Sequence, residues 1–300
     1  MWFSNLICYR FKQDVAYEQS DFEQALSQDI FRPCASQELS SFGWTNALGK
    51  HGQTLAHFSQ NCILVCAKRE EKVLPASVVN DLLAEKIEQI EREEQRPVKK
   101  KEKDELKENL LTTLLPQAFK KSSLQFAFID TENGWVIVNS GSFNKAEELL
   151  ALLRKSLGTL PVVPAFANYD LTVHLTDWLT KFTPPEGFAL GLDAELQEPD
   201  ESGAQVKFKQ FDLSSDEIQQ HLANGKLVTK LAIDWRERVK FVLQNDGTLK
   251  RLNYAETLRE QNADIPKEDM AVKIDADFIL VSEEIKALLT DLLAGLGEPE

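Results

Sequence analysis

The sequence predicts an α+β protein, and three features of the 300-residue chain lead to this prediction. Some short segments alternate apolar and polar residues, as strands do, whereas longer segments repeat apolar residues every three or four positions, as helices do. Asn133-Gly134 and Asn245-Asp246-Gly247 each lie between two alternating segments, and such residues accept the positive φ of hairpin turns. The length exceeds the commonest domain size, so we expect a multi-lobed subunit with antiparallel sheets.

Two separate parts of the chain, residues 1–75 and 123–165, combine strand and helix patterns. The predicted strands are 2–11, 54–58, 62–67 and the hairpin of 123–139, and the predicted helices are 21–28 and 144–157. Gly158 follows the second helix, at a position where glycine commonly ends a helix. We predict that residues 1–75 together with 123–165 form a central mixed α+β lobe.

Residues 76–122 contain two runs with helical spacing, which end at Arg96-Pro97 and near Pro116. We predict a projecting helical hairpin, the tip of the subunit. The run Lys99 to Lys103 between the two helices is either a solvated turn or a binding arm. Phe119 follows the second helix and is either a core residue under the next sheet or an exposed anchor for another subunit.

Residues 166–300 are predicted to form a second α+β lobe, the base of the subunit. Ser214-Ser215-Asp216-Glu217 has the pattern of a capping box, at the start of a helix that ends near Gly225. Three strands are predicted after this helix: 227–234, 236–244 and 249–254. Asp275 and Asp277 are expected at a solvated strand end, because close acid pairs arise by chance in a chain with 48 acids.

The charge of the chain is unevenly distributed. It has 34 Lys and Arg against 48 Asp and Glu, and the formal net charge of -14 argues against a nucleic-acid partner. Residues 204–254, however, contain nine bases and six acids, and residues 96–121 contain eight bases and four acids. Residues 256–300 contain twelve acids and four bases. The average therefore conceals two net-positive zones, and DNA is not excluded as a partner.

Cations alternate with apolar residues in the predicted strands of the first of these zones. Lys207 and Lys209 share one strand face, about 7 Å apart, and Arg236, Arg238 and Lys240 share a face of another strand. Cations on a rigid sheet can neutralise phosphates, which predicts salt-dependent DNA binding without sequence preference. The same pattern fits an ordinary amphipathic sheet whose outer face is rich in Lys and Arg.

No sequence motif indicates an enzyme. The chain lacks a glycine-rich phosphate loop, a nucleophile elbow and a zinc-hydrolase motif. His51 and His57 are too few to complete a metal site with the scattered cysteines. We therefore predict no catalytic site, no metal and no cofactor. The four cysteines contain no C-x-x-C pair and are expected to be buried free thiols.

The sequence contains no candidate membrane segment. The longest uncharged apolar runs, such as residues 62–67, are far shorter than the roughly 18–20 residues that a bilayer crossing needs. The amino terminus lacks the basic and apolar segments of a secretion signal. We therefore predict a cytoplasmic protein without a membrane partner.

Several long and specific motifs follow one another along the whole chain. They are Trp2-Phe3 with Asn5-Leu6, residues 70–75, Leu114-Leu115-Pro116 with Ala118-Phe119, residues 151–164, 209–218, 225–235, 241–252 and 275–280. By these motifs the chain resembles the recombination-associated protein RdgC family. Phe211 departs from the family pattern, because it interrupts a run of Lys-Gln-Asp-Leu.

The resemblance implies a ring-shaped homodimer of curved subunits, with a cationic hole through which duplex DNA can pass. It also implies binding to double- and single-stranded DNA with little sequence preference, restraint of RecA-mediated recombination, association with the nucleoid and no small-molecule substrate. Together with the strand-face argument, it leads to these predicted DNA-binding residues: Lys207, Lys209, Gln210, Arg236, Arg238, Lys240, Lys250 and Arg251. Phe119 is the predicted contact at the dimer interface.

Two alternatives stay open at this stage. The chain could be a protein-interaction module that acts on the recombinase through its acidic surface, with DNA binding incidental. The many carboxylates also leave a metal-dependent nuclease to be tested.

Overall fold

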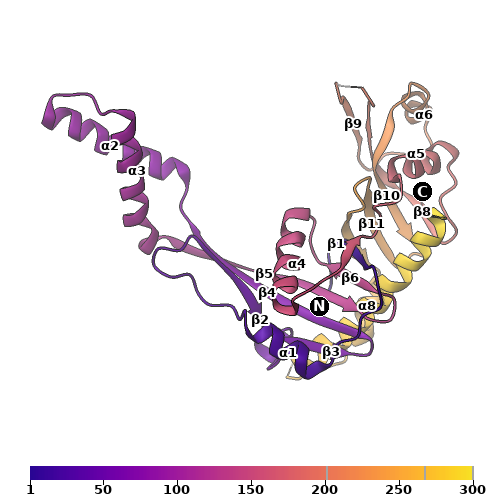
Figure 1. Cartoon of the computed structure of the whole chain (residues 1–300). Helices are drawn as coiled ribbons and strands as arrows, with labels where there is room; N and C mark the ends of the chain where they lie inside the picture. The colour runs from indigo at the N-terminus through magenta and orange to yellow at the C-terminus, as the bar shows by residue number, and fades with distance from the viewer. Residues whose placement is uncertain (201, 267, 299–300) are drawn as a thin grey trace. The chain divides into compact units, whose positions relative to one another are not determined.

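The computed structural model describes residues 1–200, 202–266 and 268–298 and confirms an α+β fold with antiparallel strand pairs (Figure 1). The fold divides into two compact units. The first unit contains Met1–Gln28, Asn46–Cys66 and Phe126–Glu300, and the second contains Asp29–Thr45 and Ala67–Gln125. The three lobes that were expected from the sequence stay a prediction.

The strands of the first unit form an antiparallel array in the order β6-β1-β12-β11-β10-β8-β9. Their bounds, with those of two shorter neighbours, are β1 (Asn5–Phe11), β3 (Ala56–Ser59), β6 (Trp135–Val138), β7 (Val162–Pro164), β8 (Phe188–Gln197), β9 (Gln205–Phe208), β10 (Leu227–Trp235), β11 (Val239–Gln244) and β12 (Leu249–Tyr254). Strands β4 (Cys62–Val73) and β5 (Phe119–Asp130) each run through both units. The strands predicted near 2–11, 54–58, 62–67 and 249–254 are confirmed.

In the part of the chain that the structure describes, six helices and two 3-10 turns complete the first unit. They are α1 (Gln19–Ser27), α4 (Phe143–Leu157), α5 (Leu171–Lys181), α6 (Asp216–Ala223), α7 (Glu256–Arg259) and α8 (Met270–Leu296), with the 3-10 turns η1 (Gly49–His51) and η3 (Glu260–Asn262). The predicted helices near 21–28 and 144–157 are confirmed, and Gly158 follows α4 with a φ of 78°.

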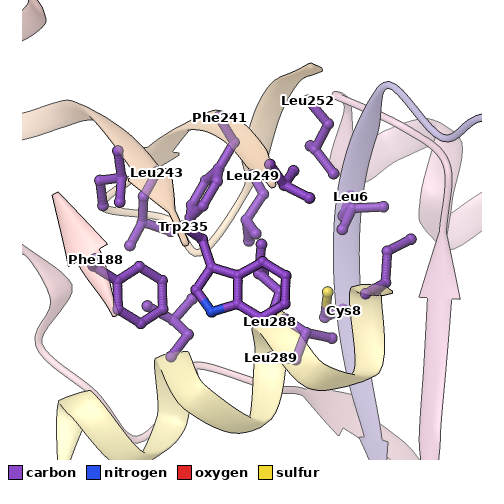
Figure 2. Close-up of a cluster of buried hydrophobic side chains, with 14 of the residues drawn as sticks. Leu6, Cys8, Phe188, Trp235, Phe241, Leu243, Leu249, Leu252, Leu288 and Leu289 are labelled. Atoms are coloured by element: carbon purple, nitrogen blue, oxygen red, sulfur yellow. The ribbon is translucent and has the colours of Figure 1, made fainter. Parts of the chain in front are cut away.

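Helix α8 corrects the expectation that Asp275 and Asp277 lie at a solvated strand end. Both residues belong to the 27-residue helix α8, whose apolar residues recur every three or four positions and are buried against the strands. Figure 2 shows Leu288 and Leu289 of α8 beside the buried ring of Trp235. The indole Nε1 donates a hydrogen bond to Asp291 of α8 at 2.8 Å, so the only polar atom of this ring has a partner.

The predicted capping box at Ser214 is wrong, although the helix after it is confirmed. Helix α6 begins at Asp216, and its N-cap, Ser215, forms no side-chain capping bond. The hydroxyl of Ser214 instead donates to Asp212 at 2.6 Å. The short side chain of Asp212 thus forms a local turn that competes with the cap. Gly225 follows the helix with a φ of 88°, as expected for a residue beyond the end of a helix.

The second unit contains the helical hairpin that was predicted over 76–122. Helices α2 (Ala76–Glu94) and α3 (Lys100–Leu114) extend from strands β4 and β5 of this unit, with η2 (Leu115–Gln117) and β2 (Ser40–Thr45) as its other elements (Figure 1). Gln95 has a left-handed conformation directly after α2, which ends the helix before Pro97. Val79 and Leu83 are buried in α2, whereas the lysines between 99 and 107 are exposed.

Among the described residues, no helix has both the length and the apolar composition that a membrane crossing requires.

Candidate nucleic-acid interface

The outer face of strands β8 to β12, opposite their buried side chains, is the part of the first unit where predicted site residues meet. On β10 the buried residues Leu231, Ile233 and Trp235 point into the core. Lys230 therefore lies on the outer face, where it is paired in register with Glu195 of β8. Glu195 is in turn paired with Lys207 of β9. Neighbouring strands thus bring charges from distant parts of the sequence into one row.

These charged residues line a hollow of about 290 Å³, which we call the outer-face hollow. Five cations and two carboxylates line it: Lys207, Lys209, Lys230, Lys250, Arg251, Asp193 and Glu195. Four of the eight residues predicted from the sequence to contact DNA are therefore brought together here. The lining groups have a net positive charge although the whole chain has a formal net charge of -14.

Glu195 lies between two of these cations. One of its carboxylate oxygens is 3.2 Å from Nζ of Lys207, and the other is 2.8 Å from Nζ of Lys230. The hydroxyl of Thr229 donates to the same carboxylate at 3.2 Å. Burial acts to raise the pKa of Glu195, but the bonds from Lys230 and Lys207 outweigh it and lower this pKa from its ordinary value. Glu195 is therefore an anion at neutral pH.

Asp193 neutralises a different part of the hollow. Its carboxylate accepts a hydrogen bond from the backbone N–H of Gln210 at 3.0 Å and another from Arg251 at 3.0 Å. The bond from Gln210 is the main cause of the lowered pKa of Asp193, burial opposes it, and Arg251 adds to it. Gln210, a predicted DNA contact, thus reaches the hollow by the hydrogen bond from its backbone N–H to Asp193.

Lys250 and Arg251 are neighbours in sequence but both line the hollow because strand β12 has a bulge. The register between β11 and β12 shifts between Lys240 and Val242, so β12 has one more residue than its partner. Arg251 has a positive φ of 56°. A bulge of this kind can direct two consecutive side chains to the same side of a sheet. Within the described chain, Lys250 forms no ion pair.

The expectation that Arg236, Arg238 and Lys240 share one strand face is wrong. Arg236 and Glu237 have φ values of 50° and 56° and form the turn between β10 and β11. Only Lys240 lies within β11, where it is 3.4 Å from Asp234 of the neighbouring strand. The two arginines leave the strand face because the chain reverses there, and β11 begins at Val239 instead of the predicted position 236.

Both of these arginines reach carboxylates of helix α8. Arg236 is 2.7 Å from Asp291, and Arg238 forms two hydrogen bonds to Glu284, one of them from its Nε at 2.8 Å. Arg236, Arg238 and Lys240 lie outside the outer-face hollow. Their roles as DNA contacts stay predictions.

Lys230, Asp193 and Glu195 line the hollow but were not among the site residues predicted from the sequence. Lys230 was counted in the net-positive zone, but the strand-face argument did not use it. Lys230 alternates with the buried Leu231, Ile233 and Trp235, but only its pairing with Glu195 of β8 brings it to the hollow. Asp193 and Glu195 belong to a segment without cations, and only strand pairing places them beside the lysines.

Comparison with known proteins identifies the family of the chain. The family model described as "Putative exonuclease, RdgC" matches residues 1–299.

The chain belongs to the RdgC family.

Curated relatives within this family have the name "Recombination-associated protein RdgC". The relative from Pseudoalteromonas translucida (strain TAC 125) is 78% identical over 298 residues, which cover 99% of this chain and 98% of the relative. The relative from Aeromonas hydrophila subsp. hydrophila is 48% identical over 300 residues, or 100% and 99% of the two chains. That from Yersinia pestis (strain Pestoides F) is 46% identical over 297 residues, or 99% and 98%. The resemblance expected from the motifs is confirmed over the full length.

Phe119 occupies an exposed position in this RdgC-family chain. It is the first residue of β5, and 86% of its surface is exposed. The alternative that Phe119 is a core residue under the next sheet is therefore wrong for the single chain. Its role at a dimer interface stays a prediction.

The remaining chemistry-bearing side chains of the RdgC-family chain lie elsewhere. All four cysteines are buried thiols outside any disulfide, as predicted, and burial raises the pKa of Cys62 to about 11 and that of Cys66 to about 12. His57 pairs with Asp275 of α8 at 2.6 Å. Across residues 1–200, 202–266 and 268–298, no three His, Cys, Asp or Glu side chains are grouped so as to hold a metal ion.

Proposed function

We propose that this RdgC-family protein binds the phosphate backbone of double- and single-stranded DNA without sequence preference, and that the outer-face hollow is its main contact. The observation that carries this proposal is the gathering of five cations from three different segments around one hollow. Groups on neighbouring strands are held about 5 Å apart by the backbone ladder. The positions of the charges are therefore set before DNA arrives.

Contacts of this kind are independent of base sequence. Lys and Arg neutralise phosphates, release bound counterions and so make affinity fall steeply with salt concentration. Phosphate contacts orient a protein on DNA but do not read its bases. The local positive charge of the hollow also explains how a chain with a formal net charge of -14 can bind a polyanion.

We further propose that two copies close into a ring around duplex DNA and restrain RecA-mediated recombination by occupying the DNA, which would place the protein on the nucleoid. The family resemblance and the exposed Phe119 support this arrangement. In it, a tip of residues 76–122 forms one contact between copies, the central lobe comprises 1–75 with 123–165, and the base of residues 166–300 carries the outer-face hollow.

The test of the main contact uses the full-length protein and a fluorescent 30-base-pair duplex. We expect Lys209→Ala and Lys250→Ala each to weaken binding to several unrelated sequences alike and to reduce the slope of log K against log salt by about one. Lys181→Ala is the matched control, because Lys181 lies on α5 and pairs with Asp177 outside the hollow. Slopes that stay equal to wild type in both hollow variants would contradict the proposed contact.

The description of the matching family model makes an exonuclease the second candidate. In the outer-face hollow, however, both carboxylates are held by cations of the chain, Glu195 by Lys207 and Lys230 and Asp193 by Arg251. Metal-dependent nucleases instead gather carboxylates around one or two metal ions. Incubation of end-labelled DNA with the protein and Mg²⁺ or Mn²⁺ decides between the two, and we expect the DNA to stay at full length.

A protein-interaction module that contacts the recombinase directly predicts a different dependence on DNA. If the protein acts by occupying DNA, the amount needed to restrain RecA rises in proportion to DNA length. If it acts by direct contact, the amount follows the concentration of RecA and is independent of DNA length. Titrations on single strands of three lengths at constant RecA distinguish these outcomes.

A further inference from the structure

We infer that Glu195 and Asp193 limit the affinity of the outer-face hollow for DNA by cancelling part of its positive charge, so that bound DNA can be released. This inference rests on the proposed DNA-binding function. The affinity for DNA then depends on these two carboxylates as well as on the cations that attract phosphate.

Glu195 is built into the sheet and stays in the hollow when an anion arrives. It is 6% exposed and lies within β8, paired on one side with Lys207 of β9 and on the other with Lys230 of β10. Thr229 donates a hydrogen bond to it from the adjacent strand. A phosphate therefore has to share Lys207 and Lys230 with a carboxylate that is held in place.

Asp193 acts on the other end of the hollow in the same way. The backbone N–H of Gln210 fixes its carboxylate at 3.0 Å, and Arg251 pairs with it at 3.0 Å. The backbone bond holds Asp193 independently of Arg251. The guanidinium of Arg251 is 62% exposed at its side chain, so it can also reach a phosphate while Asp193 remains.

The size of the effect follows from counterion release. Each phosphate neutralised by the protein contributes about 0.9 to the slope of log K against log salt. Conversion of one carboxylate into an amide keeps the shape and adds one net positive charge. The slope should therefore steepen by about 0.9, which corresponds to roughly eightfold tighter binding at 0.1 M salt and to no difference near 1 M salt.

The experiment compares Glu195→Gln with Glu198→Gln in the full-length protein, on the fluorescent duplex between 0.05 and 0.5 M salt, a range of about one decade. Glu198 directly follows β8 and pairs with Lys226, and it does not line the hollow. Both variants change the net charge of the chain equally. We expect the gain of roughly eightfold at 0.1 M salt only in Glu195→Gln. An equal response of the two variants would overturn the inference.

A second pair of measurements tests the route of the effect. In a Lys207→Met/Lys230→Met background, Glu195→Gln should no longer tighten binding, because the cations that it would release are absent. Asp193→Asn, in which the amide oxygen can still accept from Gln210, should steepen the slope like Glu195→Gln. If Glu195→Gln has a lowered melting temperature, Asp193→Asn is used in its place. A slope equal to that of wild type in Asp193→Asn would then count against the inference.

The failure of this inference differs from the failure of the proposed function. If wild-type protein does not bind the duplex at 0.05 M salt, the proposed function is wrong. If wild-type protein binds, and Lys209→Ala weakens it, but neither amide variant differs from Glu198→Gln, only the limit set by Glu195 and Asp193 is wrong.

Discussion

Arg238, in the turn before β11, and Lys207 of β9 both pair with carboxylates that the fold buries. Glu284, the partner of Arg238, lies on α8 and is 8% exposed. Two hydrogen bonds join the two side chains, and the bond to Glu284 raises the pKa of Arg238 further. A buried carboxylate without a partner keeps its desolvation cost. Arg238 is therefore important for the stability of the fold, whatever its role toward DNA.

We predict that Arg238→Ala lowers the free energy of unfolding by about 1–3 kcal/mol, because Glu284 is left buried without its cation. Urea denaturation followed by circular dichroism measures this change. Lys181→Ala is the control, since its pair with Asp177 is exposed on helix α5 and should contribute only about 0.3–0.5 kcal/mol. Equal losses of unfolding free energy in the two variants would show that Arg238 does not stabilise the buried carboxylate of Glu284.

The same variant also tests Arg238 as a DNA contact. If the guanidinium leaves Glu284 for a phosphate, Arg238→Ala reduces the slope of log K against log salt by about one. An unchanged slope together with lower stability assigns Arg238 to the fold alone.

The carboxylates of the outer-face hollow make stability depend on pH in the acid range. The pKa of both Glu195 and Asp193 is lowered in the folded chain. Such groups bind fewer protons in the folded state, so their contribution is complete above the ordinary carboxyl pKa of about 4 and is lost as pH falls through the lower folded value. We predict a smaller loss of stability between pH 6 and pH 3 in Glu195→Gln than in wild type.

Urea denaturation at the two pH values measures this difference, because urea leaves the ion pairs unscreened. Glu198→Gln supplies the matched comparison for removal of one acid outside the hollow. An identical loss in wild type and Glu195→Gln would mean that Lys207 and Lys230 do not hold the carboxylate in solution.

At the scale of elements, hairpin turns decide which cations face together. The hairpins around residues 133–134 and 245–247 were predicted from their glycines, and both exist. Gly134 and Gly247 have φ values of 69° and 81°, whereas their Asn and Asp neighbours keep negative φ. The two-residue turn at Arg236-Glu237 has positive φ at both positions without any glycine. Non-glycine residues are uncommon at positive φ, so the residue types did not indicate the position of this turn.

We predict that Gly247→Ala is more destabilising than Gly158→Ala, although both glycines have nearly equal positive φ, 81° and 78°. A Cβ on Gly247 would lie 2.9 Å from the ring of Phe166, whereas a Cβ on Gly158 would meet nothing within 4 Å. Both variants bear a backbone cost of about 1–2 kcal/mol. Overpacking should add about 1–3 kcal/mol to Gly247→Ala alone.

Urea denaturation of the two variants checks this order. Equal losses would mean that Phe166 moves aside without cost and that the hairpin of β11 and β12 is loosely packed. This hairpin carries Lys250 and Arg251, so its packing bears on the geometry of the outer-face hollow.

At the scale of the whole molecule, the proposed ring depends on a contact between two copies. Phe119 exposes 86% of its surface, and exposed aromatic residues that become buried in an interface often dominate binding energy. We predict that Phe119→Ala weakens dimerisation by about 2 kcal/mol, or roughly thirtyfold in the dissociation constant. Sedimentation velocity over a range of protein concentrations measures this change.

Phe182→Ala is the control for loss of an exposed ring, because Phe182 is 47% exposed at the end of helix α5. Its sedimentation should match that of wild type. If Phe119→Ala also sediments as wild type at every concentration, Phe119 is not part of the dimer contact.

The sequence by itself was sufficient for the family, the α+β class, the helical hairpin, most strands and the buried thiols. These features depend on local patterns: apolar spacing of two or of three to four residues, glycines in turns and short motifs in order. Lys207, Lys209, Lys250 and Arg251, which line the hollow, were predicted as DNA contacts from the positive zone, the strand faces and the family resemblance.

Only the tertiary structure decided which charges act together. The turn at Arg236 and the bulge at Arg251 each change the face on which a side chain lies. A change of one residue in a strand reverses its faces, and alternation in sequence does not record it. Strand pairing, which joins residues far apart in sequence, placed Glu195 and Asp193 among the lysines. The cations could be predicted from the sequence, whereas the carboxylates that pair with them were identified only from the folded sheet.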